Sequence, residues 1–160
     1  MRNNKTIEVL NTDAEGRLIM ADALAYASER KPDLICDVAT LTGASYVALG
    51  LDIGAVFSND DETLENYLSA NKNSHEKYHN LPLEESYKPL IKSVIADMKN
   101  TGGRFGGAIT AALLLEEFVD DIKWIHLDIA GPARNQDSKS ATGFGTIGLY
   151  NFFESFTKSL

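Results

Sequence analysis

Short apolar runs rich in β-branched residues alternate along the chain with longer runs in which apolar residues recur at helical spacing. Runs of the first kind are typical of strands, and runs of the second kind are typical of helices. The pattern predicts strands at residues 6–10, 34–39, 55–58, 93–98 and 124–130. It predicts helices at residues 16–30, 43–49, 62–73, 108–119 and 146–158.

Capping and turn-forming residues set the ends of these elements. We expect the first helix to stop before Pro32 and the second to end near Gly50. Either Asp60 or Asp61 can accept hydrogen bonds from the first amides of the third helix. Residues 74–89 are polar and contain two prolines, so we expect an extended surface connection there.

The alternation of strands and helices predicts an α/β fold with a largely parallel sheet. In such sheets, ligands bind at the carboxyl ends of the strands. The loops that follow Leu10, Ala39, Met98 and Ala130 are therefore the expected sites of chemistry.

Composition narrows the class of protein. The 160 residues fit one domain, and 44% hydrophobic with 24% charged residues is ordinary for a globular protein. A net charge of -8 repels phosphate backbones and anionic lipid, so we expect neither nucleic acid nor a membrane as a partner. The chain has one cysteine, Cys36, and residues 1–5 lack the apolar core of a signal peptide. These features predict a cytoplasmic protein.

The segment after the first predicted strand carries two carboxylates, Asp13 and Glu15. Two positions apart on extended backbone, they would point to the same side. Carboxylates are hard ligands for Mg²⁺, Mn²⁺ or Zn²⁺, and one carboxylate can bridge two ions about 3.5–4 Å apart. Gly16 permits close backbone approach, and Arg17 adds a fixed positive charge. The alternative is that Asp13 caps the following helix, because acidic residues are favoured at helix N-termini.

A second metal motif lies in the polar connection. His75, Glu76 and His79 fit H-E-x-x-H, which on a helix places two histidines one turn apart beside a possible general base. A zincin-type zinc protease needs that helix in a core, whereas the neighbouring residues here are polar and Pro82 ends any helix just afterwards. The zincin interpretation is therefore kept as an alternative only.

Several other features receive structural interpretations. Residues 101–107 are rich in glycine but lack the G-K-[ST] ending of a phosphate loop, so we expect them to form tight turns. His126 and Asp128 share a predicted buried strand. We expect His126 to be a hydrogen-bonded core histidine and Asp128 to be a hydrogen-bonded structural carboxylate near the site. Cys36 is expected to be a small core residue.

The sequence NTDAEGRL at residues 11–18, continued by IMADALAYA, resembles the signature of the leucyl (cytosol) aminopeptidase family. Further segments resemble the same family in the same order, and the resemblance covers essentially the whole chain. These segments are residues 37–44, 96–100, 107–112, 124–131 and 141–143. The resemblance implies a three-layer α/β/α fold with a largely parallel, partly truncated central sheet. It also implies that residues 1–160 are part of the C-terminal catalytic domain.

The resemblance implies a metal-dependent aminopeptidase that releases N-terminal residues, often leucine, from peptides. Asp13 would be a metal ligand, and Glu15 would bridge two divalent ions, Mn²⁺ or Zn²⁺. Arg17 would hold a bicarbonate-like anion that assists proton transfer. The two ions would bind the free amino terminus and the scissile carbonyl and activate a water molecule.

The resemblance also implies that the loop after the second strand binds the peptide substrate. Thr40, Leu41 and Gly43 are the implied contacts, with the Leu41 carbonyl and the Gly43 amide facing the substrate or the nucleophilic water. Family members are homo-hexamers with active sites that face an interior cavity, so the same assembly is implied for the parent protein.

One part of the family pattern has no match in this sequence. The family supplies further metal ligands, a lysine and two aspartates, together with a catalytic lysine, from a segment upstream of the signature. The ten residues before Asn11 do not provide them. We therefore expect the chain to be a fragment with little or no peptidase activity alone, because two carboxylates are too few for two ions. The alternative is a folded module without enzymatic activity.

Overall fold

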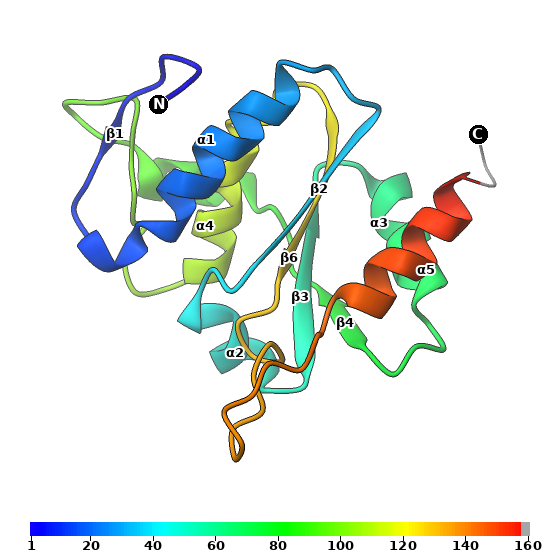
Figure 1. The fold of residues 1–160 in the computed structure, drawn as a ribbon. Helices are drawn as coiled ribbons and strands as arrows, with labels where there is room; N and C mark the ends of the chain where they lie inside the picture. Colours follow the sequence, from blue (N-terminus) through cyan, green and yellow to red (C-terminus); the bar gives the residue numbers. More distant parts are fainter. Residues whose placement is uncertain (158–160) are drawn as a thin grey trace.

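The computed structural model describes residues 1–157 as alternating helices and strands (Figure 1). The strands are β1 (Ile7–Glu8), β2 (Leu34–Ala39), β3 (Ile53–Ser58), β4 (Lys77–Asn80), β5 (Met98–Lys99) and β6 (Lys123–Asp128). The α-helices are α1 (Gly16–Ser28), α2 (Gly43–Leu49), α3 (Asp61–Ala70), α4 (Gly107–Glu116) and α5 (Thr146–Thr157). Two 3-10 helices are η1 (Thr12–Ala14) and η2 (Glu85–Ile91). None of the helices within residues 1–157 is long and apolar enough to cross a membrane.

The main sheet has four strands in the order β2-β6-β3-β4, and β1 pairs with β5 in a separate two-stranded sheet. The pairs β1–β5, β2–β6 and β3–β4 are parallel, as the sequence predicts. The pair β3–β6 is antiparallel, so the four-stranded sheet is mixed. The seven residues of α2 rise only about 10 Å, which is too short to bring the chain back to the end of the sheet at which β2 begins. The strand β3 therefore begins at the end of the sheet where β2 finishes, and it runs antiparallel to β6.

Helices cover both faces of this sheet (Figure 1). On one face, α1 and α4 pack over a core that includes Phe57 and Trp124. On the other, α3 and α5 pack over a second core that includes Val56 and Ile125. Neighbouring residues of β3 and of β6 thus enter opposite cores, as the two-residue repeat of a strand requires. The predicted α/β/α layering is confirmed.

Two segments differ from the sequence prediction. Residues 93–98 are not a strand, apart from Met98 at the start of β5. Val94 and Ile95 are 99% and 79% exposed, so this β-branched run has no core to pack against. The strand β4 lies inside the connection predicted to be irregular, and it pairs only with β3 at the edge of the sheet. Polar side chains are compatible with such an edge position.

Candidate metal and substrate site

The two segments singled out by sequence, residues 13–17 and 40–43, are brought together at the carboxyl ends of their strands. Residues 13–17 follow β1, and residues 40–43 follow β2. A methyl group added at Gly16 would lie 3.8 Å from Cδ1 of Leu41, which is van der Waals contact. The acidic turn and the predicted substrate loop are therefore neighbours.

Both carboxylates of the acidic turn are exposed and available. Within residues 1–157, the side chains of Asp13 and Glu15 make no hydrogen bond or ion pair. The side chain that caps η1 is that of Asn11, whose Oδ1 accepts from the backbone amide of Asp13 at 3.0 Å. Glu15 occupies the capping position of α1 without a capping hydrogen bond. The alternative of a helix-capping Asp13 is therefore wrong.

Arg17 lies half-buried on the first turn of α1. Its Nη1 donates to the backbone carbonyl of Asn100 at 2.7 Å. Burial lowers the pKa of Arg17, and the Asp128 carboxylate acts in the opposite direction. A guanidinium remains charged under these conditions. The structure thus places a fixed, partly desolvated positive charge beside the acidic turn.

Asp128 holds the loop that follows β2. Its carboxylate is 1% exposed and accepts hydrogen bonds from the Leu41 amide at 3.0 Å, the Thr42 hydroxyl at 2.6 Å and the Ala130 amide at 3.2 Å. The Thr42 hydroxyl in turn accepts from the Ser45 amide at 3.1 Å and caps α2. The prediction of a hydrogen-bonded structural carboxylate near the site is confirmed.

The predicted substrate residues differ in their exposure. Thr40 and Gly43 are exposed, whereas Leu41 is half-buried and its amide is bound to Asp128. The Asp128 carboxylate therefore fixes the backbone between the two exposed positions. A ligand could reach Thr40 and the start of α2 from solvent.

The other buried polar group of the sheet is centred on Asp37. Its Oδ2 accepts from Nε1 of Trp124 at 2.7 Å, and its Oδ1 lies 2.5 Å from Nδ1 of His126. His126 is 1% exposed, and its ring stacks with those of Phe57 and Trp124. The prediction of a core histidine with a hydrogen-bond partner is confirmed.

The stability of the protein is expected to depend on pH through His126. Burial lowers the pKa of His126, whereas the charge and hydrogen bond of Asp37 and the charge of Asp128 raise it, and the net shift is upward. A pKa raised on folding adds stability that is fully present below the unfolded pKa, about 6.5, and lost as pH rises through the folded pKa. The difference in free energy of unfolding between wild type and His126→Phe, measured by urea titration, should therefore shrink as the pH rises above about 6.5. A difference that grows with pH would contradict this assignment.

The H-E-x-x-H motif does not form a zincin site. His79 lies in the strand β4, and His75 lies in the bend before it, so no helix presents the two rings on one face. The Glu76 carboxylate is 9% exposed and accepts from the amides of Gly145 and Gly148 at the start of α5, at 3.0 and 2.7 Å. Glu76 is therefore a helix cap, and the zincin alternative is wrong.

The glycine-rich loop before α4 is used for packing. A methyl group added at Gly102 would lie 2.6 Å from Cγ2 of Thr110, and Gly106 adopts a left-handed φ of 61° at the start of α4. Both positions require the absence of a side chain. The prediction that these glycines form tight turns fits this geometry.

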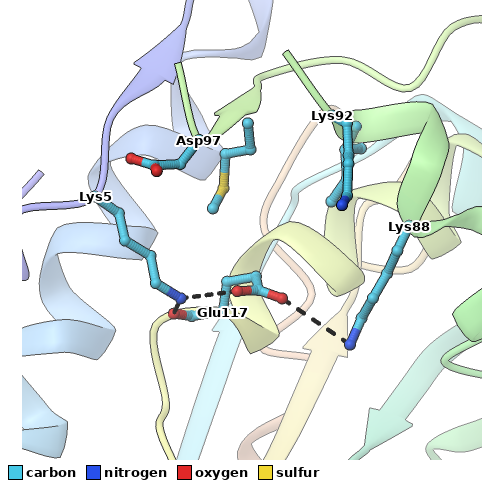
Figure 2. Close-up of a pocket in the computed structure, with 7 residues that line it drawn as sticks. Lys5, Lys88, Lys92, Asp97 and Glu117 are labelled. Carbon is cyan, nitrogen blue, oxygen red and sulfur yellow. Dashed lines mark hydrogen bonds and ion pairs between the residues drawn. The ribbon is translucent and has the colours of Figure 1, made fainter. Parts of the chain in front are cut away.

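A pocket of about 390 Å³ lies elsewhere, at the amino ends of β1 and β5 (Figure 2). Lys5 and Asp97, which precede these two strands, line it together with Lys88 and Glu117. Nζ of Lys5 donates to a Glu117 carboxylate oxygen at 2.7 Å, and Nζ of Lys88 lies 3.9 Å from the other oxygen. The acidic turn follows the opposite ends of the same strands, so this pocket contains none of the predicted site residues.

The donor set of the acidic turn fits a hard divalent ion in type. Two exposed carboxylates without protein partners are oxygen ligands that Mg²⁺, Mn²⁺ and Zn²⁺ accept. Within residues 1–157, no group of three or more His, Cys, Asp or Glu side chains is arranged to hold a metal ion. Asp13 and Glu15 can therefore supply part of a metal site, and further ligands are needed for tight binding.

Comparisons with known proteins identify the family of the chain. The catalytic-domain model of the cytosol aminopeptidase family matches residues 1–150. Leucine aminopeptidase 1 of Arabidopsis thaliana is 50% identical over 158 residues, covering 98% of this chain and 30% of that protein. A probable cytosol aminopeptidase of Prochlorococcus marinus is 54% identical over 158 residues, covering 95% and 32%.

Solved structures show the same likeness. A tomato leucine aminopeptidase mutant matches with a TM-score of 0.91 and 50% identity, over 94% of this chain and 30% of that one. The bottromycin maturation enzyme BotP matches with a TM-score of 0.93 and 37% identity, over 98% and 36%. The chain spans 27% and 32% of the length of two of the curated relatives that it matches. The chain belongs to the cytosol aminopeptidase family, by its match to the family's catalytic domain.

Proposed function

We propose that this chain contributes part of the active site of a metal-dependent aminopeptidase that removes N-terminal residues from peptides. The observation that carries the proposal is the position of two exposed carboxylates, unpaired within residues 1–157, on a turn that lies beside the loop containing Leu41. Asp13 and Glu15 would supply two of the ligands to a pair of divalent ions, Mn²⁺ or Zn²⁺, and further ligands would complete the site. When bound, such ions polarise the scissile carbonyl and lower the pKa of water.

The remaining groups have roles that follow from their positions. Arg17 carries a positive charge on the turn after Glu15, where it can hold an anion such as bicarbonate that accepts a proton during the reaction. Thr40 and Gly43 flank the fixed Leu41 amide and can orient the peptide backbone. The active enzyme is proposed to be a homo-hexamer in which further ligands complete the metal site.

Metal binding by the 160-residue chain tests the carboxylate assignment. In a ¹⁵N-resolved NMR titration, Mn²⁺ should broaden the amide signals around Asp13 and Glu15 first, with a dissociation constant on the order of 1 mM for so few ligands. The double variant Asp13→Asn, Glu15→Gln should lose this local broadening. The exposed Asp33, which precedes β2 at the other edge of the sheet, provides the control Asp33→Asn, which should leave the broadening unchanged.

Activity gives the second readout of the same proposal. With Mn²⁺ and leucine p-nitroanilide, the chain alone should show no turnover above background, because two carboxylates do not hold two ions. Robust turnover would show that the site is complete within these 160 residues. Absence of any local Mn²⁺ effect would instead favour a folded module without a metal site.

A further inference from the structure

Asn100 is a fully buried asparagine whose side chain forms hydrogen bonds with the segment that leads into the acidic turn. Its exposed fraction is 0%. Oδ1 of Asn100 accepts from the amides of Leu10 and Asn11 at 2.9 and 3.2 Å, and Nδ2 donates to the carbonyl of Asn11 at 2.6 Å. One amide side chain therefore satisfies three backbone groups just after β1 ends.

The backbone of Asn100 adds two more connections. Its amide donates to the Glu8 carbonyl at 3.0 Å, which extends the β1–β5 pairing by one step. Its carbonyl accepts from Nη1 of Arg17 at 2.7 Å. The same residue thus contacts the strand before the acidic turn and the guanidinium after it.

The contacts form a continuous path to the carboxylates. Asn100 fixes both polar backbone groups of Asn11, and Oδ1 of Asn11 accepts from the Asp13 amide at 3.0 Å. Fixing Asn11 therefore fixes the start of η1, on which Asp13 lies. The carboxylates of Asp13 and Glu15 have no hydrogen-bond or ion-pair partner within residues 1–157, so their placement depends on the backbone that carries them.

Asparagine has the functional groups that this position requires. The position needs one acceptor for two amides and one donor for a carbonyl, at the length of a single methylene. Aspartate cannot donate when ionised, and an apolar residue of similar size would leave the amides of Leu10 and Asn11 and the carbonyl of Asn11 without their side-chain partner.

We infer that Asn100 is a positioning residue of the metal site, setting the backbone from which Asp13 and Glu15 reach the ions and at the same time orienting Arg17. The inference rests on the proposed function, because it concerns the same carboxylates. Residues that orient metal ligands from behind typically change metal affinity by about 10–100-fold when removed.

The test is the Mn²⁺ titration of the 160-residue chain carrying Asn100→Ala. We expect Mn²⁺ to bind at least about tenfold more weakly at Asp13 and Glu15. Amide hydrogen exchange at Leu10 and Asn11 should accelerate, since both amides lose their acceptor. Should Asn100→Ala not fold, Asn100→Asp keeps the acceptor and loses the bond to the Asn11 carbonyl, and a several-fold loss of Mn²⁺ affinity is expected.

Asn71 provides a matched control on the far side of the sheet. It is 6% exposed, and its Nδ2 donates to the carbonyls of Tyr67 and Gly148 at 3.0 and 3.1 Å. Asn71→Ala also removes a buried side-chain amide that binds two backbone groups, but one that does not contact the acidic turn. It should therefore reduce stability and leave Mn²⁺ affinity unchanged. An equal loss of affinity in Asn71→Ala and Asn100→Ala would overturn the inference, because general destabilisation would then explain both.

The outcomes for the two proposals are separable. If the unmodified chain shows no local Mn²⁺ effect, the proposed function fails and the positioning role fails with it. If the unmodified chain binds Mn²⁺ and a folded Asn100→Ala binds it equally well, the positioning role alone is refuted. Weaker binding in Asn100→Ala, with unchanged binding in Asn71→Ala, supports both.

Discussion

Replacement of Asp37 by alanine should lower the free energy of unfolding by about 3–5 kcal/mol, the range for removing one partner of a buried ion pair. The carboxylate is the shared partner of Nε1 of Trp124 and Nδ1 of His126, both of which are buried. Without it, two buried polar groups lose their partner, and His126 loses the charge that favours its protonated form. Urea unfolding followed by far-UV circular dichroism measures the loss.

The exposed Asp33, one residue before β2, gives the control. Asp33→Ala removes a carboxylate that is exposed to solvent, and it should change the free energy of unfolding by no more than about 0.5 kcal/mol. A loss below about 1 kcal/mol for Asp37→Ala would show that water replaces the carboxylate. The sheet would then tolerate the loss of the Asp37 carboxylate as the partner of Trp124 and His126.

The sequence predicted best those elements whose signals are local. The strand at residues 34–39 and the helix at residues 43–49 have the predicted bounds, because a buried apolar run and a Thr42 cap with Gly50 at the end define them. The N-cap of α3 is Asp60, one of the two candidates. Helix α1 ends at Ser28, two residues before the predicted end.

The misses arise where tertiary context overrides local pattern. The β-branched residues Val94 and Ile95 predict a strand, but no neighbouring element covers them. The residues of β4 are mostly polar and become a strand only because β3 offers an unpaired edge. The direction of β3 depends on the length of α2, which is too short to span the sheet. Hydrophobic periodicity predicts that a strand forms but not its direction relative to its neighbours.

The sequence supplied candidate ligands for the proposed site and one of its supports, the buried carboxylate of Asp128, but not the support from Asn100. The spacing of Asp13 and Glu15 after a strand points to cation chemistry, and the strand ends point to the loop at Thr40. Asn100 carried no comparable signal, since its role depends on the parallel pairing of two strands that lie 90 residues apart. The sequence marked the loop after Met98, in which Asn100 lies, and the family-like segment at residues 96–100, but neither indicated what the Asn100 side chain binds.

Replacement of Asp128 by alanine should destabilise the protein by about 3 kcal/mol, because the Leu41 amide and the Thr42 hydroxyl both lose a buried acceptor. Thr42→Ala loses only one of these bonds and the cap of α2, so about 1 kcal/mol is expected. Hydrogen exchange at the Leu41 amide separates the two variants: it should accelerate strongly in Asp128→Ala and little in Thr42→Ala. Because residues 40–43 owe their backbone geometry to this carboxylate, Asp128→Ala should also disorder the loop while leaving the acidic turn, which Asn100 holds, in place. Equal protection of Leu41 in the two variants would mean that the packing of the Leu41 side chain against the core, and not the Asp128 carboxylate, fixes the backbone of the loop.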